Sequence, residues 1–260
     1  TVPATQMFDD YLYVSSTNQT FKDHFSNMAD RFIQEFSLNQ ESFVLDIGSN
    51  DGVFLSPLKE NGIKILGVDP AENLVNLANS NGLETLHGYF DDKITDEIIA
   101  SKGRADIVTA FNVFAHADDL KSITKNVFKL LKSSGIFIIE VQYLLDTIKD
   151  LTFDNIYHEH VNYWSVNALQ FFFDSLDLKL EKVEHVNTHG GSIRAFISAK
   201  KEAETDSSVE DFIAKEKQFG LDNFATLKQF ASSISDLKNT TNNKIKELKS
   251  QGKSIVGYGS

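Results

Sequence analysis

Residues 44–52 of the chain read Val-Leu-Asp-Ile-Gly-Ser-Asn-Asp-Gly, and this stretch decides the fold. A short apolar strand runs into a loop that has glycine at both ends. Glycine lets a backbone approach a ligand closely, and open α/β sheets bind ligands at the carboxyl ends of their strands. The loop departs from Gly-X-Gly-X-X-Gly spacing and carries Asn50 and Asp51. Carboxylates there would repel a pyrophosphate and suit a cationic ligand.

Short apolar runs alternate with helical patterns along the following part of the chain. The apolar runs are residues 43–47, 63–68, 107–110 and 136–141, and helical patterns occur at 74–78 and 120–131. Near-continuous apolar strands separated by helices indicate a parallel sheet covered on both faces. Two further β-type stretches, 178–185 and 192–199, are joined by a short link that contains glycine, which favours an antiparallel pair at the end. The predicted class is a doubly wound α/β sheet.

The periodicity divides the chain into three parts: a helical lead-in over residues 1–40, a core over 41–201 and a helical extension over 202–260. In the lead-in, Phe21, Phe25, Met28 and Phe32 recur at helical spacing. The chain closes with an apolar run and a Gly-Tyr-Gly turn, a pattern that normally begins a βα unit. We therefore expect the extension to include the start of a truncated second α/β domain.

Composition excludes several functional classes. The 260 residues include 25 Lys and Arg against 37 Asp and Glu, a net charge of −12, and no Cys. Without Cys there is no disulfide, thiolate metal site or Cys nucleophile. The negative field disfavours nucleic acid as a partner. No apolar run approaches the length of a membrane span, and no secretion signal is recognisable, so we expect a cytoplasmic protein with no membrane partner.

Residues 154–164 gather side chains that can move protons. Tyr157, His158, Glu159 and His160 lie in this run, and His116 follows the fourth strand. An imidazole that is neutral near pH 7 can take a proton beside a carbonyl, and an adjacent carboxylate can orient it. Two alternatives stay open. The histidines could bind a metal, although His-X-His lacks the i, i+4 spacing of the helical zinc signature, or they could be ordinary surface or core histidines.

The loop and a second acid together carry a family resemblance. Residues 45–52, with Gly-Val-Asp-Pro at 67–70, resemble the S-adenosylmethionine (SAM) loop and ribose acid of class I methyltransferases. The resemblance implies a seven-stranded sheet whose last strand is antiparallel, and SAM as the cofactor. It also implies the cofactor-binding residues: Asp46, Gly48, Asn50 and Gly52 at the methionine end, Asp69 at the ribose, Phe90 and Asp91 at the adenine, and Asn112 near the sulfonium. A generic βαβ turn with surface acids is the plain alternative.

Three further motifs, which occur in a fixed order along the chain, narrow the resemblance to one family of methyltransferases. Residues 140–143, 157–160 and 188–194, with 7–11 upstream, are similar to the C-methyltransferases that act on nucleotide-linked keto-deoxysugars. The similarity runs from about residue 3 to the end. Family members usually begin with a Cys-rich zinc domain and continue into a second nucleotide-fold domain. The chain has no Cys and halts after its Gly-Tyr-Gly turn, which leaves the part that would hold the nucleotide diphosphate in doubt.

The resemblance also implies a mechanism. A base removes the proton beside the ketone, and the resulting enolate attacks the methyl group. His160 would be the base, while Tyr157, Glu159, His116 and Tyr11 would orient it, hold the sugar or stabilise the enolate. The residues expected to hold the substrate are His158, His189, Gly190, Gly191 and Arg194.

Other functions compete with this one. A hairpin turn with a surface Arg is the plain alternative for residues 189–194. SAM-dependent O- or N-methyl transfer to another small molecule is the enzymatic alternative. A non-catalytic nucleotide-binding module and a dehydrogenase are the others, and the acids of the loop disfavour the dehydrogenase.

Overall fold

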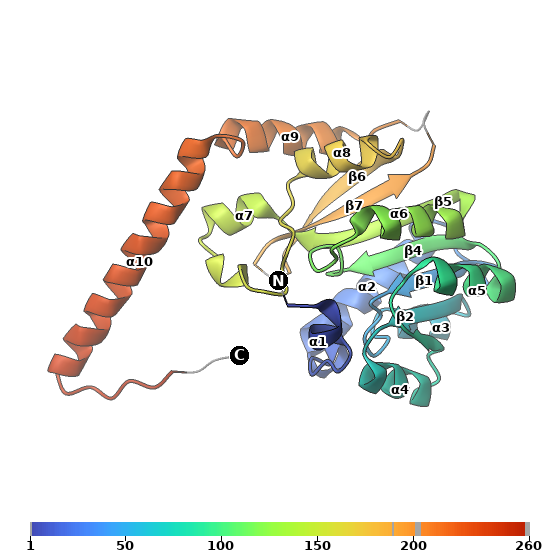
Figure 1. Cartoon of the computed structure of the whole chain (residues 1–260), viewed down its shortest axis with the longest axis horizontal. Helices are drawn as coiled ribbons and strands as arrows, with labels where there is room; N and C mark the ends of the chain where they lie inside the picture. Colours follow the sequence, from blue (N-terminus) through green and yellow to red (C-terminus); the bar gives the residue numbers. More distant parts are fainter. Residues whose placement is uncertain (1, 189, 201–203, 258–260) are drawn as a thin grey trace.

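A seven-stranded sheet in the order β3-β2-β1-β4-β5-β7-β6 forms the centre of the protein (Figure 1). The computed structural model describes residues 2–188, 190–200 and 204–257. Strand β7 runs antiparallel to both neighbours and the other pairs are parallel, which confirms the predicted fold class. The strands are β1 (Phe43–Ile47), β2 (Lys64–Asp69), β3 (Thr85–His87), β4 (Ala105–Phe111), β5 (Leu131–Gln142), β6 (Lys179–Val186) and β7 (Ser192–Ser198).

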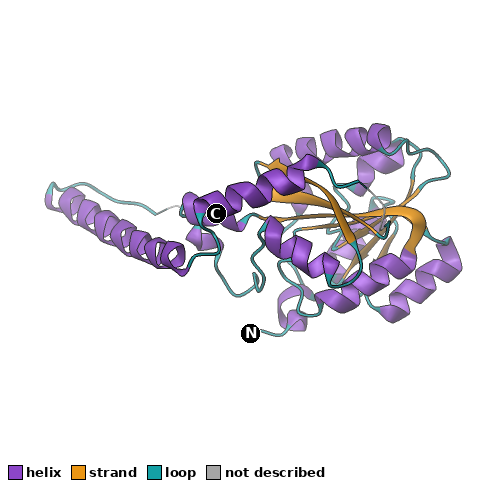
Figure 2. Ribbon diagram, turned by 90° about the horizontal axis from the view of Figure 1, so that it is seen from above, coloured by secondary structure: helices purple, strands orange, loops and turns teal. Residues whose placement is uncertain are grey.

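Helices pack on both faces of this sheet (Figure 2). In β1, Val44 belongs to one apolar cluster and Leu45 to the other, because successive strand residues point to opposite faces. The helices are α1 (Ala4–Phe8), α2 (Gln19–Glu35), α3 (Leu55–Glu60), α4 (Glu72–Ser80), α5 (Asp92–Lys102), α6 (Leu120–Leu130), α7 (Leu144–Lys149), α8 (Val166–Asp174), α9 (Ser207–Phe219) and α10 (Phe224–Ser250), with 3₁₀ turns η1 (Ser15–Thr17) and η2 (Phe153–Asn155).

Helix α2 is the predicted amphipathic lead-in, and it packs on the sheet together with α3. Asn18 caps its first turn by accepting a hydrogen bond from the Thr20 N–H at 2.9 Å. Phe25 and Phe32 are buried on its inner side. The Phe32 ring lies 6.3 Å from that of Phe196 on β7. The aromatic stripe therefore ties the N-terminal part of the chain to the sheet.

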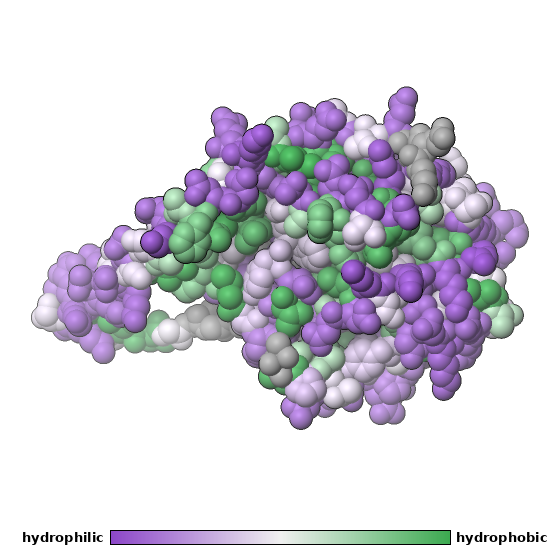
Figure 3. Space-filling view, turned by 45° about the horizontal axis from the view of Figure 1, so that its top comes forward, coloured by the Kyte–Doolittle hydropathy of each residue, from purple (hydrophilic) through white to green (hydrophobic). Residues whose placement is uncertain are grey.

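The C-terminal extension begins on the sheet and then leaves it. Val209 of α9 is fully buried, and the Ser208 hydroxyl accepts a hydrogen bond from the Val183 N–H of β6. Helix α10 buries none of its residues and projects from the body (Figure 1). Figure 3 shows a mostly hydrophilic surface over α10 and hydrophobic side chains where it joins the body.

One sequence expectation needs correction, and one strand was not predicted. The apolar run at 254–256 does not form the predicted strand, because no strand lies beside the described residues 253–257 to pair with them. The short strand β3 was not predicted from the sequence, because its three residues form no recognisable apolar run.

No helix of the described ranges is long and apolar enough to cross a membrane.

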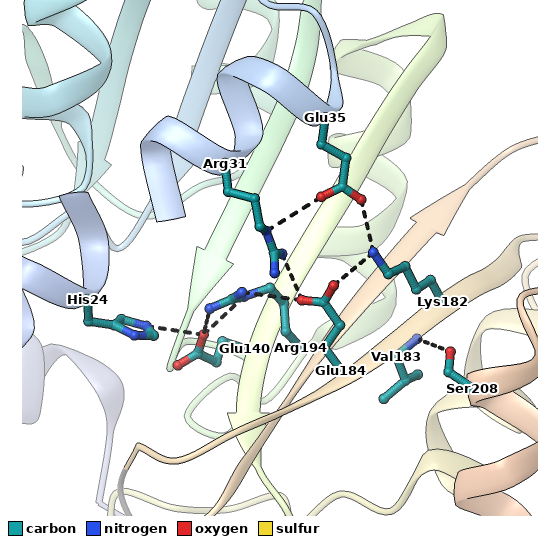
Figure 4. Close-up of polar contacts among 9 residues, drawn as sticks. All are labelled: His24, Arg31, Glu35, Glu140, Lys182, Val183, Glu184, Arg194 and Ser208. Atoms are coloured by element: carbon teal, nitrogen blue, oxygen red, sulfur yellow. Dashed lines mark hydrogen bonds and ion pairs between the residues drawn. The ribbon is translucent and has the colours of Figure 1, made fainter. Parts of the chain in front are cut away.

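A buried ion-pair cluster joins three strands to α2 (Figure 4). Arg194 of β7 stands in register with Glu140 of β5 and Glu184 of β6. Its Nη2 lies 2.9 Å from Glu140 Oε2, and its Nη1 lies 3.4 Å from Glu184 Oε2. Arg31 of α2 completes the link at 2.7 Å from Glu184. The predicted role of Arg194 in holding substrate is therefore not supported, since the residue is 5% exposed and its guanidinium is paired inside the fold.

The charge on Glu140 depends on this cluster. Burial by itself would raise the pKa of Glu140, but the His24 imidazole and the Arg194 guanidinium beside it hold that pKa at about 2. The His24 Nε2 lies 3.6 Å from Glu140 Oε2, which is ion-pair rather than hydrogen-bond range. Removing one partner of such a pair leaves an uncompensated buried charge.

We predict that Arg194→Met lowers the free energy of unfolding by about 3–5 kcal/mol, measured by urea denaturation at pH 7. The double variant Glu140→Gln, Arg194→Met is the control and should regain most of this loss, because it buries no lone charge. An unchanged urea midpoint for the single variant would contradict the assignment of the pair.

The same pair predicts an acid dependence of stability. The pKa of Glu140 is lower in the folded protein than its ordinary 4.5, so its stabilisation is present above that pH and is lost as the pH falls toward about 2. The wild type should therefore lose stability over this interval more steeply than Glu140→Gln. Parallel curves of unfolding free energy against pH would rule out this role of Glu140.

Candidate functional site

The loop after β1 turns sharply where the strand ends. Gly48 and Asn50 both adopt positive φ, +66° and +53°. A Cβ on Gly48 would lie 2.5 Å from Cγ2 of Val113, so only glycine fits there. The Gly48 N–H donates to the Val68 carbonyl at 2.8 Å, which fixes the turn against β2.

Two buried carboxylates stand at the ends of β1 and β2. Asp46 accepts a hydrogen bond from the Thr109 hydroxyl at 2.6 Å, and burial raises its pKa to about 7. Asp69 accepts from the N–H of Asn50 at 2.8 Å and from that of Ala71 at 2.9 Å. Burial also raises the pKa of Asp69. These hydrogen bonds fix the Asp69 carboxylate in place beside the loop.

One cavity of about 760 Å³ brings most of the predicted site residues together. Both acids line it, and so do Asp118 and Asp119 from the loop before α6. These carboxyl groups suit a cationic ligand, because a nearby positive charge favours their ionised form. The predicted residues that line the cavity are Tyr11, Asp46, Gly48, Asn50, Asp69, Phe90, Asn112, His116, Tyr157 and His160.

The His160 ring is held in one tautomer. Its Nδ1 lies 2.7 Å from the Asn155 carbonyl, which can only accept, so in the neutral ring Nδ1 carries the proton and Nε2 keeps the lone pair. The loop around it is fixed because the N–H groups of Val161 and Asn162 both donate to the Ala115 carbonyl, at 2.8 and 3.1 Å. An imidazole so arranged can accept a proton at Nε2.

Aromatic and phenolic groups surround this imidazole. The ring centroids of His116 and Tyr157 lie 4.8 and 4.4 Å from that of His160. The hydroxyls of Tyr11 and Tyr157 each lie 3.5 Å from Oε2 of Glu159. Burial and the Glu159 charge raise the pKa of both phenols, so both stay protonated at neutral pH and can donate hydrogen bonds. Glu159 does not line the cavity, but it is hydrogen-bonded to the two tyrosines that do.

The structure places several predicted residues elsewhere. Gly52 does not line the cavity. It packs against Leu83, since a Cβ on Gly52 would lie 2.5 Å from Leu83 Cδ1. Asp91 caps α5 by accepting from the Ile94 N–H at 2.9 Å, and its side chain faces solvent. His158 is exposed and does not line the cavity. For these positions, the expected contacts with cofactor or substrate are not supported.

The predicted patch after β6 is separate from the main cavity. Gly190 and Gly191 line a smaller hollow of about 410 Å³ together with Lys149 and Lys215. A Cβ on Gly191 would lie 2.4 Å from Asp146 Oδ2, so glycine is required there by close packing. His189 lies outside the described residues.

Sequence reasoning did not single out many of the lining residues, among them Phe21, Phe25, Gln142 and Asn155. Phe21 and Phe25 belong to the stripe of α2, which the periodicity assigned to packing alone, yet they also wall the cavity. Gln142 lies at the carboxyl end of β5, and Asn155 lies five residues before His160. These positions, within motifs that the sequence analysis had noted, could have identified both residues. Among the described residues, no three His, Asp or Glu side chains come together as a metal-ligand set.

Comparisons with known proteins agree with this geometry. Residues 21–183 match the methyltransferase domain family, and residues 187–260 match the C-methyltransferase C-terminal domain. The chain is 31% identical over 254 residues to C-methyltransferase NovU of Streptomyces niveus, covering 97% of the chain and 60% of that protein. A ubiquinone biosynthesis O-methyltransferase of Bradyrhizobium diazoefficiens is 32% identical over 97 residues, 37% of the chain and 38% of that protein.

A solved structure confirms the fold. Magnesium protoporphyrin IX methyltransferase of Synechocystis, determined with bound S-adenosylhomocysteine, superposes with a TM-score of 0.53 at 12% identity, over 69% of the chain and 87% of that structure. The methyltransferase domain match covers more than half of the chain and includes the loop, both acids and the imidazole group. The chain belongs to the S-adenosylmethionine-dependent methyltransferases, in the group that carries the C-methyltransferase C-terminal domain.

Proposed function

We propose that the chain transfers the SAM methyl group to the carbon beside the ketone of a nucleotide-linked keto-deoxysugar. The observation that carries this proposal is that the cofactor loop and the Nδ1-protonated His160 line one cavity. A carbon acid needs a base before it can attack a methyl group, whereas many oxygen nucleophiles need far less. The match to NovU, a C-methyltransferase, supports carbon as the acceptor.

The acids and the sharp turn fit SAM. Asp69 would hold the ribose hydroxyls, and Asp46 with Gly48 would hold the methionine end. Phe90 would pack on the adenine and Asn112 would lie near the sulfonium. The acidic wall would stabilise the positive sulfur, and glycine at 48 would admit close contact between the backbone and the cofactor. When bound, SAM supplies an electrophilic methyl group.

We assign a separate role in the reaction to His160 and to each of the residues around it. His160 Nε2 would take the proton from the substrate carbon, which leaves an enolate. The enolate carbon would bond to the methyl carbon as the bond from that methyl to sulfur breaks, with S-adenosylhomocysteine as the leaving group. When substrate binds, the protons of the Tyr11 and Tyr157 phenols would turn from Glu159 to the substrate oxygen that becomes negative. His116 packs beside the base and keeps its ring in place. A positioned base contributes about 10²–10⁴-fold to such a rate.

O-methyl transfer is the second candidate, because ubiquinone biosynthesis O-methyltransferases also match part of the core. Only C-methyl transfer requires that a proton be removed from the substrate carbon. We predict that the protein, given a nucleotide-linked keto-deoxysugar and S-adenosylhomocysteine in D₂O, exchanges the proton beside the ketone for deuterium, followed by NMR.

Adding SAM in place of S-adenosylhomocysteine should then yield a product methylated at that carbon. Methylation at oxygen or nitrogen without prior exchange would favour the second candidate. SAM binding without S-adenosylhomocysteine formation would indicate a non-catalytic binding module.

His160→Ala should lose at least about 10²-fold in turnover while its SAM dissociation constant stays near the wild-type value, because Nε2 serves the substrate and not the cofactor. Isothermal titration calorimetry and product analysis measure the two effects. His185→Ala is the matched control, since His185 pairs with Asp146 outside the main cavity and should keep full turnover. Full activity of His160→Ala would refute the assignment of the base.

Asp69→Ala should weaken SAM binding by about 1–3 kcal/mol, because it removes the acceptor for the ribose hydroxyls. Calorimetry gives the affinity, and the melting temperature shows whether the lost hydrogen bonds from Asn50 and Ala71 unfold the loop. An unaltered SAM affinity in a folded variant would remove Asp69 from the cofactor site.

A further inference from the structure

A segment before α2 crosses the same edge of the sheet as the cofactor loop. We refer to residues 9–16 as the strap. Its first residue, Asp9, accepts hydrogen bonds from the Tyr89 hydroxyl at 2.9 Å and from the Glu72 N–H at 3.3 Å. Tyr89 follows β3 and Glu72 begins α4, so the strap is fixed to elements that follow two neighbouring strands.

The far end of the strap is held by the cofactor loop itself. Asn50 Oδ1 accepts from the Ser15 N–H at 3.0 Å, and its Nδ2 donates to the Tyr13 carbonyl at 2.9 Å. Asp51 Oδ2 accepts from the Ser16 N–H at 3.3 Å. The Asn50 side chain is thus occupied mainly by the strap, although we had expected it to face the methionine end of the cofactor.

The middle of the strap carries Tyr11 and is clamped by one side chain of α4. The carboxamide of Asn73 accepts from the Tyr11 N–H at 3.3 Å and donates to the Tyr11 carbonyl at 2.8 Å. A single amide therefore holds both main-chain groups of the residue whose hydroxyl reaches the catalytic cavity. This arrangement fixes the backbone of Tyr11 from both sides.

The strap has little other support around Tyr11. The side chain of Leu12 is 90% exposed and that of Tyr13 is 45% exposed, and Asp9 and Asp10 are also exposed. Ring contacts of Phe8 with Tyr11 and His116, at 5.8 and 5.6 Å between centroids, are the nearest apolar packing. Because few apolar groups are buried, hydrogen bonds decide where the strap lies.

We infer that Asn73 is a positioning residue that holds the Tyr11 hydroxyl beside Glu159 and Tyr157 in the catalytic cavity. The inference rests on the proposed function, in which Tyr11 donates a hydrogen bond to the enolate oxygen. Asn73 does not line the cavity, so it acts only through Tyr11. A misplaced donor weakens the stabilisation of developing charge without removing the cofactor site.

The same helix provides a matched control. Asn79 of α4 makes an equivalent clamp, accepting from the Thr85 N–H at 3.1 Å and donating to the Thr85 carbonyl at 2.9 Å. Both asparagines have exposed side chains, and neither lines the catalytic cavity. Asn73→Ala and Asn79→Ala therefore remove the same two types of hydrogen bond from one helix, and only the first is connected to Tyr11.

Hydrogen–deuterium exchange of the whole chain tests the clamp without any turnover. Asn73→Ala should speed exchange of the Tyr11 amide, whereas Asn79→Ala should speed exchange of the Thr85 amide and leave Tyr11 unchanged. An unaltered Tyr11 amide in Asn73→Ala would overturn the clamp, whether or not the proposed function holds.

A double-mutant cycle with Tyr11→Phe tests the catalytic part. Asn73→Ala should lower kcat about 10- to 100-fold with little change in SAM affinity, and should cost almost nothing further in the Tyr11→Phe background. Asn79→Ala should keep kcat. Fully additive losses would overturn positioning through Tyr11. No turnover by the wild type on any keto-sugar nucleotide would refute the proposed function, and the exchange result would still decide the clamp.

Discussion

The parallel pairing of β1 with β2 and β4 is the constraint on which the site depends. It places the carboxyl ends of these strands at one edge, where Asp46, Asp69 and Asn112 all line the same cavity. The chain can turn there because Gly48 has no side chain and because Asn50 and Asn112 accept positive φ. The proposed cofactor contacts of Asp46, Gly48, Asp69 and Asn112 follow from this shared edge.

The side chains that we propose as catalytic come from elements that are far apart in the sequence, so the fold must hold them together by other means. The loop that carries His160 is hydrogen-bonded to Ala115, and Tyr11 arrives on the strap. The strap in turn leads into α2, which is fixed to the sheet by its aromatic stripe and by the cluster of Glu140, Arg194 and Glu184. Because breaking a buried ion pair is costly, this cluster helps to fix the position of α2. Phe25 of α2 in turn lines the cavity.

Sequence reasoning reached the fold, and it named ten residues that the structure gathers in one cavity, because both rest on local patterns. The apolar runs gave the buried parallel strands, and the loop at 48–52 marked the ligand edge. It failed where the partner is distant. Arg194 looked like a substrate ligand because its pairing with Glu140 depends on strand register, and Asn73 carried no signal because its partner is an irregular segment 62 residues away. Asp91 was assigned to adenine, although its position before a helix also suits an N-cap.

The proposed function requires that the cofactor's methyl group and the lone pair of His160 meet in one cavity. A crystal structure with S-adenosylhomocysteine tests it most directly, through the position of the sulfur relative to His160 Nε2. We expect the sulfur to face Nε2 across a gap wide enough for one substrate carbon and the transferred methyl, with the ribose hydroxyls on Asp69. A ligand seated with its sulfur turned away from His160, or with its ribose remote from Asp69, would contradict it.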